Sequence, residues 1–187
     1  YFARFMPLRS DKALIGIEIG MQTHTAEADK KIAQSHAFDY VLASIHCIGR
    51  RDLYEPTCYE GRTRQQIVGE FLHESITCLE QERDFDSFAH IDYICRYWPY
   101  TGVERELRLS DAPELFDRLL TLLIEKNKPI EINTRRLDDA AAVAGLLPLY
   151  KRYHELGGRF CTLGSDAHYK EHVGRRLQEA LELAKEC

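Results

Sequence analysis

The sequence has no long apolar run free of charged residues, no low-complexity tract and no short internal repeat. The first absence excludes a transmembrane helix, which needs about 20 consecutive apolar residues. The first residues also lack the basic and apolar regions of a secretory signal peptide. We therefore expect a cytoplasmic protein that does not interact with a membrane.

Cysteine pairs with the spacing of metal or redox sites are missing too. None of the six cysteines belongs to a Cys-x-x-Cys motif, which argues against a thiolate zinc site or a thioredoxin-like motif. An even number permits disulfides, but irregular spacing in a chain without a secretory signal favours reduced thiols. The six are Cys47, Cys58, Cys78, Cys95, Cys161 and Cys187.

Positive charge is in the minority, because 25 Lys and Arg stand against 30 Asp and Glu, for a formal net charge of −5. Nucleic-acid-binding domains normally carry a basic patch, so we do not expect nucleic acid as a partner. The 187 residues are 44% hydrophobic and 29% charged. This composition fits one soluble globular domain over residues 1–187.

Five short apolar segments have the composition of strands that are covered on both faces. A stretch of helical periodicity follows each of them, and this alternation predicts an α/β domain with a mostly parallel sheet. Five strand–helix units are too few to close a barrel of eight or seven units, so either the sheet is open or units are missing. The expected strands are Ala13–Ile19, Tyr40–Ile45, Phe85–Ala89, Pro129–Asn133 and Arg159–Leu163, and the expected helices are Thr25–Ala37, Thr63–Glu82, Asp111–Lys126, Leu137–Leu156 and His172–Lys185.

Polar side chains lie at the end of every predicted strand. In parallel α/β folds these ends share one face, where ligands and catalytic groups gather. Taken singly, each group has an ordinary structural explanation, such as a salt-bridged strand end or a turn residue. Five such coincidences are less probable than one shared site. The residues are Glu18, His46, His90, Asn133 with Thr134, and Asp166 with His168.

Histidine and carboxylate side chains without cysteine favour zinc, manganese or iron. Several such divalent ions held close together suit the hydrolysis of phosphate esters. The carboxylate of Glu18 has two oxygens and is the natural bridge between two ions. The remaining histidines are expected to face solvent; they are His24, His36, His73, His154 and His172.

The motifs GIEIG, ASIH, FAHID, EINT and GSDAH, in this order, resemble the histidinol-phosphatase branch of the polymerase-and-histidinol-phosphatase (PHP) superfamily. The resemblance covers the chain from about residue 14 to the last helix. It implies a distorted, TIM-like (β/α)7 barrel with up to three divalent metals at the carboxyl ends of the strands. It also implies a phosphomonoesterase that hydrolyses L-histidinol phosphate to L-histidinol and phosphate, by attack of a metal-bound hydroxide on phosphorus.

The same resemblance assigns a role to five residues. Glu18 matches the bridging carboxylate, and His46 and His90 match its companions at the second metal. Asp166 matches the aspartate of the first metal, and His168 matches a histidine of the third. Glu18 and Asp166 are the expected catalytic residues of this set.

One part of the family pattern is not found, namely the His-x-His motif of the first strand. No histidine precedes His24, and the sequence begins at Tyr1. We therefore expect the first one or two strand–helix units to be lacking, fewer bound metals than three, and poor turnover by this chain. The strand at Ala13–Ile19 would then have an exposed edge, which favours a homo-oligomer.

Arginine is suited to bidentate contacts with phosphate. Arg135 and Arg136 follow the fourth strand next to Asn133 and are the preferred candidates, and Arg50 lies just beyond His46. The alternative is that at least half of the arginines in these loops are solvated surface charges. The aromatic run at residues 96–100 either forms a wall against an imidazole ring or covers the core.

Two other functions stay open. The first is a related enzyme that acts on a different phosphate ester, and the second is a truncated, non-catalytic metal-binding module. A serine nucleophile is disfavoured because no Gly-x-Ser-x-Gly motif is present.

Overall fold

Five parallel strands form the central sheet of the computed structural model, which describes residues 1–187, and their order is β1-β2-β5-β6-β7. This sheet confirms the predicted α/β class, and each predicted strand is present with somewhat different bounds. The strands are β1 (Gly16–Gly20), β2 (Tyr40–Ser44), β5 (Ser87–Phe88), β6 (Ile130–Asn133) and β7 (Cys161–Gly164).

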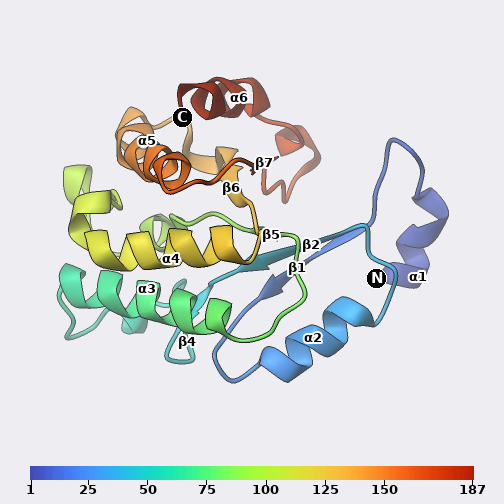
Figure 1. The fold of residues 1–187 in the computed structure, drawn as a ribbon, viewed down its shortest axis with the longest axis horizontal. Helices are drawn as coiled ribbons and strands as arrows, with labels where there is room; N and C mark the ends of the chain where they lie inside the picture. The colour runs from blue at the N-terminus through green and yellow to red at the C-terminus, as the bar shows by residue number, and fades with distance from the viewer.

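Helices follow the strands in chain order, as the alternation predicts (Figure 1). The long helix α3 packs against α4, α4 against α5, and α5 against α6. The N-terminal helices lie at the β1 end of the sheet, far from α6 in Figure 1. The helices are α1 (Phe2–Phe5), α2 (Ala26–Gln34), α3 (Arg64–Glu80), α4 (Pro113–Glu125), α5 (Ala140–Glu155) and α6 (Leu177–Glu186).

Local sequence explains why α3 begins where it does and which face it buries. Thr63 and Gln66 form a reciprocal capping box, in which each side chain bonds the other's backbone N–H. Ile67, Phe71 and Leu79 recur on one face and are fully buried. The helix therefore combines a strong start signal with a continuous contribution to the core.

Replacing Phe71 with alanine is expected to lower the free energy of unfolding by about 3–5 kcal/mol, because the change leaves a cavity in the core. Phe71 is only 1% exposed. Urea denaturation followed by circular dichroism measures the effect. The control is Val103→Ala, at a residue 66% exposed, which should shift stability by less than about 0.5 kcal/mol. Equal effects of the two changes would contradict the assigned core.

Several helix boundaries differ from the sequence prediction, and two of them have a clear local cause. The last helix begins at Leu177 rather than at His172, because residues 170–172 form a 3-10 turn and Arg176 has a left-handed backbone with φ of 56°. Helix α4 begins at Pro113 rather than at Asp111, since proline favours the first turn of a helix. Neither change moves a residue of the predicted site.

A short hairpin that the sequence analysis did not predict follows β2. Its strands are β3 (Cys47–Ile48) and β4 (Arg51–Asp52), joined by Gly49 and Arg50. Both joining residues have positive φ, at 55° and 67°. This is the geometry of a type I′ hairpin turn. The turn places Arg50 at the exposed tip of the hairpin.

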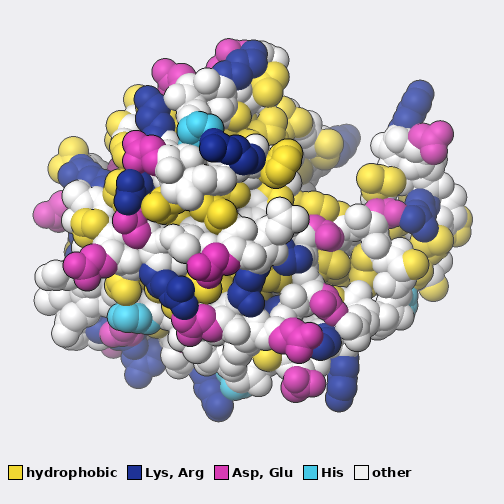
Figure 2. Space-filling view, in the orientation of Figure 1, with side chains coloured by type: hydrophobic (Ala, Val, Ile, Leu, Met, Phe, Trp, Pro, Cys, Tyr) yellow, Lys and Arg dark blue, Asp and Glu magenta, His cyan; other side chains and the backbone are white.

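The sheet is open at both ends, because β1 pairs only with β2 and β7 pairs only with β6. Large apolar side chains near both ends are exposed, including Leu14 (67%) and Phe160 (71%). Figure 2 shows a notch between the N-terminal segment and the rest of the molecule, with hydrophobic side chains along it.

All six cysteines carry free thiols. No helix has both the length and the apolar character needed to cross a bilayer.

Candidate metal centre

Three of the predicted site residues converge at one place. Glu18 lies on β1, His46 follows β2, and His90 follows β5, and these three strands are neighbours in the sheet. One carboxylate oxygen of Glu18, Oε1, lies 3.2 Å from His46 Nε2 and 3.3 Å from His90 Nε2. All three donor atoms lie within 4.8 Å of one another. Parallel pairing of the strands thus brings together residues that are 72 positions apart in sequence.

The donor set fits a divalent zinc ion. Zinc takes imidazole nitrogen and carboxylate oxygen at about 2.0–2.2 Å in tetrahedral geometry, which separates neighbouring donors by about 3.4 Å. The measured separations of 3.2 Å and 3.3 Å from Glu18 are close to this value. The Nδ1 atom of His90 is buried and has no hydrogen-bond partner. We therefore describe Glu18, His46 and His90 as the metal cluster.

The electrostatics of the cluster keep Glu18 ionised. Burial raises the pKa of this carboxyl, but the hydrogen bonds from His46 and His90 together lower it by a larger amount. The pKa of Glu18 therefore lies well below the usual range for a glutamate. An ionised carboxylate is the form that binds a cation. Tyr93 packs on both imidazoles, with ring centroids 4.2 Å from His46 and 5.1 Å from His90. This contact restricts how the two rings can turn.

Asp166 lies in the loop after β7 and faces two guanidinium groups. Arg96 Nη1 donates to Asp166 Oδ2 at 2.6 Å, and Arg135 Nη1 lies 3.5 Å from the same oxygen. Asp166 has a left-handed backbone, with φ of 47°, which an aspartate tolerates better than most residues. Its carboxylate, 10% exposed, is thus held at the mouth of the site by two arginines.

The other predicted site residues are placed differently. His168 is 66% exposed and its Nδ1 contacts only Asp166, so it stays outside the metal cluster. The structure corrects the prediction that Arg136 binds phosphate. Its guanidinium is buried and paired with Asp92 at 3.1 Å and with Glu106 at 2.6 Å. It has no free face for a phosphate. Arg50 is exposed on the β3–β4 turn.

Most residues outside the site behave as expected. Four of the remaining histidines are exposed and His172 is half-buried. In the aromatic run, Trp98 is buried and Tyr100 packs against it edge to face, so these two cover the core. Tyr97 instead packs edge to face against Tyr93, with ring centroids 5.4 Å apart, next to the cluster.

Sequence reasoning missed two residues of the site. Arg96 was noted only as part of the aromatic run, and nothing in its spacing from His90 marks it as a contact of Asp166. Glu131 was read as part of a buried strand. Its position two residues before Asn133 was a usable signal, because side chains at i and i+2 point to the same face of a strand.

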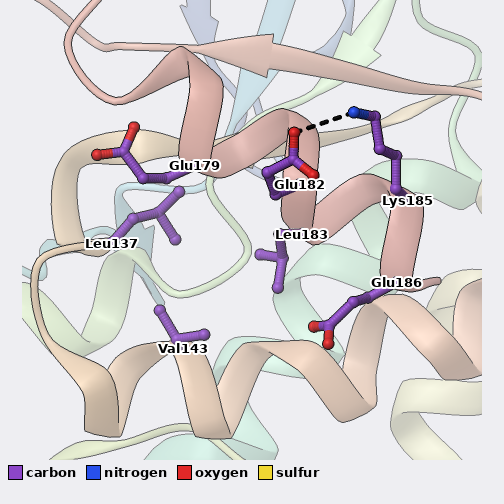
Figure 3. Close-up of a pocket in the computed structure, with 7 residues that line it drawn as sticks. All are labelled: Leu137, Val143, Glu179, Glu182, Leu183, Lys185 and Glu186. Carbon is purple, nitrogen blue, oxygen red and sulfur yellow. Dashed lines mark hydrogen bonds and ion pairs between the residues drawn. The ribbon is translucent and has the colours of Figure 1, made fainter.

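A hollow of about 430 Å³ adjoins the cluster. Its walls include Glu18, His90, Glu131 and Asp166, from both ends of the sheet. A different hollow, of about 530 Å³, lies between α5 and α6 and is drawn in Figure 3. Glu179, Glu182 and Glu186 line that one, so it repels a phosphate, and its carboxylates are not grouped closely enough to hold a metal ion as Glu18, His46 and His90 are. The first hollow is therefore the candidate site.

The sequence matches the PHP domain family over residues 2–135. A Clostridium acetobutylicum protein named as a probable histidinol-phosphatase is 41% identical over 187 residues, which is 100% of this chain and 72% of that protein. The histidinol-phosphatase of Lactococcus lactis is 31% identical over 177 residues, which is 94% of this chain and 65% of that protein.

Two solved structures share the fold. One is the L. lactis histidinol phosphate phosphatase in complex with zinc, L-histidinol and phosphate, with a TM-score of 0.82 and 29% identity. The alignment covers 98% of this chain and 69% of the L. lactis chain. A Listeria monocytogenes protein described as a histidinol phosphatase aligns at a TM-score of 0.76 and 17% identity, over 96% of this chain and 74% of its own.

Proposed function

This chain belongs to the PHP domain family, in its histidinol-phosphatase branch, and from that premise we propose that it is a metal-dependent phosphomonoesterase of L-histidinol phosphate. The products are L-histidinol and phosphate. The observation that carries the proposal is the metal cluster, which is formed by Glu18 on β1 and by the histidines that follow the adjacent strands β2 and β5. The L. lactis relative with zinc, L-histidinol and phosphate bound supports the same substrate.

Divalent metals act as Lewis acids at such centres, where they polarise phosphoryl oxygens and make water a better nucleophile near neutral pH. In this chain Glu18, His46 and His90 would hold the ion. Zinc is the ion we propose, because two imidazoles and one carboxylate are a typical zinc donor set. Manganese and iron are the alternatives that metal analysis of the purified protein would separate.

We assign phosphate binding to Arg96 and Arg135. Both guanidinium groups contact Asp166, and Asn133 Oδ1 accepts hydrogen bonds from Arg96 Nη2 at 3.2 Å and from the Arg135 backbone N–H at 3.0 Å. Arg135 is 44% exposed and so is free to turn toward a ligand. The asparagine thus orients the guanidinium of Arg96, which also lies over Tyr93, the ring that packs on both imidazoles of the metal cluster. A phosphate would be attracted there.

The test is phosphate release from L-histidinol phosphate by the purified chain, before and after chelation. We expect release that depends on zinc, stops with a chelator and returns when zinc is added. A panel of other phosphate esters serves as the comparison. Faster turnover of another ester would favour a different substrate, and zinc binding without turnover of any ester would favour a metal-binding module.

We also propose that the open sheet edges pair with a second copy of the chain. An exposed strand edge offers unpaired N–H and C=O groups to another chain. Edge strands β1 and β7 both lack a partner on one side. Sedimentation velocity over a hundredfold range of concentration should show a shift toward dimers. A single monomeric species over that range would contradict this proposal.

A further inference from the structure

Glu131 is a buried carboxylate without a cationic partner. It is 4% exposed on the central strand β6, and no arginine, lysine or histidine lies within ion-pair distance of it. Burying a charge without a partner costs free energy unless hydrogen bonds replace the lost water. Two hydrogen-bond donors replace the lost water here, and the residues they belong to indicate the role of the carboxylate.

Both hydrogen bonds end on one oxygen and come from site residues. Glu131 Oε2 accepts the backbone N–H of His90 at 2.9 Å and the side-chain amide of Asn133 at 3.0 Å. The first bond fixes the backbone of a metal-cluster residue on β5. The second fixes the amide, so that its oxygen faces Arg96 and the Arg135 backbone.

The hydrogen bonds therefore form one continuous chain across three strand ends. It runs from His90 through Glu131 and Asn133 to Arg96, and from Arg96 to Asp166 at 2.6 Å. Glu131 is the only residue of this chain of hydrogen bonds that contacts both a metal-cluster residue, His90, and the asparagine that holds Arg96. Removing it would release both sides together.

The neighbouring strand has no side chain at the place where this carboxylate lies. A Cβ atom added at Gly164 on β7 would lie 1.9 Å from Glu131 Oε1 and 2.8 Å from its Cδ. Gly164 pairs with Asn133 in the sheet and its backbone does not have a positive φ. The glycine is thus required for space rather than for backbone conformation.

We propose that Glu131 is a positioning residue that sets the place of His90 in the metal cluster and, through Asn133, the place of Arg96. This inference deepens the proposed function and rests on it for the role of Arg96, whereas the effect on the metal cluster stands alone. Residues that support metal ligands by hydrogen bonding typically contribute about 10- to 100-fold in metal affinity.

The test is the zinc affinity of the full chain, measured by competition with a chromophoric chelator, which needs no turnover. Glu131→Ala should weaken zinc binding about 10- to 100-fold. Glu131→Gln keeps an oxygen acceptor at the same place and should stay within about threefold of the wild type. The cobalt(II) absorption spectrum should change in the alanine variant and be restored in the glutamine variant.

Gly164→Ala supplies a second variant in case Glu131→Ala folds poorly. Its methyl group displaces the carboxylate, so zinc binding should weaken here too. In the double variant with Glu131→Ala the added methyl finds space, so the two losses should be smaller than additive. Fully additive losses would overturn the inference.

The control is Asp29→Ala. Asp29 is also a buried carboxylate, but its partners are Arg83 and Thr25, outside the network. This variant should lose stability and keep its zinc affinity. Unchanged zinc affinity in folded Glu131→Ala, or an equal loss in Glu131→Gln, would overturn the inference. Zinc results as expected in a chain without phosphatase activity would refute the proposed function alone.

Discussion

Glu18→Ala is expected to weaken zinc binding by more than about 100-fold, beyond the loss typical of residues that only support a ligand, and to reduce phosphate release from L-histidinol phosphate to background. Glu18 is the one residue whose oxygen contacts both imidazoles of the cluster, at 3.2 Å and 3.3 Å. Its loss removes the only negative charge of the cluster. Competition with a chromophoric chelator gives the affinity, and a phosphate assay gives the rate.

Two further variants separate charge from shape at this position. Glu18→Gln keeps the shape and removes the charge, and it should bind zinc almost as poorly as the alanine variant. Glu27→Ala, an exposed carboxylate on α2, is the matched control and should leave both measurements unchanged. Zinc binding by Glu18→Ala at the wild-type affinity would contradict the assignment of the metal cluster.

Arg96→Met is expected to lower kcat/KM for L-histidinol phosphate about 10- to 100-fold, because a charge-assisted hydrogen bond contributes about 1.5–3 kcal/mol. The side chain is 7% exposed and its guanidinium already faces Asp166 and Asn133. Inhibition by inorganic phosphate should weaken by a similar factor, and zinc affinity should change little. Steady-state kinetics and phosphate inhibition measure the two effects.

Arg96→Lys tests whether phosphate binding requires the planar, bidentate guanidinium group or only its positive charge. Lysine keeps the charge but offers no bidentate geometry, so it should recover only part of the lost activity. The control is Arg118→Met, whose partner Glu80 lies on the surface, with both side chains 48% exposed. If Arg96→Met bound phosphate like the wild type, Arg135 alone would have to carry the phosphate, and our assignment would be wrong.

Much of the fold could be predicted because it depends on local patterns. Apolar runs and helical periodicity predict the alternation of strands and helices. The predicted end of α5 at Leu156 is one residue from the observed end at Glu155, just before Gly157, whose φ is 110°. The β3–β4 hairpin was missed because its strands have only two residues each. The start of α6 was placed too early, because helical periodicity alone does not show the left-handed backbone at Arg176.

The metal cluster could be anticipated for a similar reason. Glu18 lies on β1, and His46 and His90 lie just after β2 and β5, so parallel pairing of these neighbouring strands brings the three together. Asp166 and His168 follow the same rule, but their loop directs Asp166 toward the arginines and leaves His168 exposed. Strand position predicts proximity, whereas loop conformation decides the contact.

The arginines mark the boundary between what sequence and structure determine. Arg135 and Arg136 are adjacent in sequence, yet the first is exposed beside Asp166 and the second is buried with Asp92 and Glu106. Arg96 meets Asp166 across 70 positions of sequence. The order of the elements, the approximate strand ends and the donor types could be read from the sequence, because they follow from periodicity and residue chemistry. Which cations face the site, and the link from them through Glu131 to His90, depend on the folded structure, because long-range packing sets the direction of a side chain.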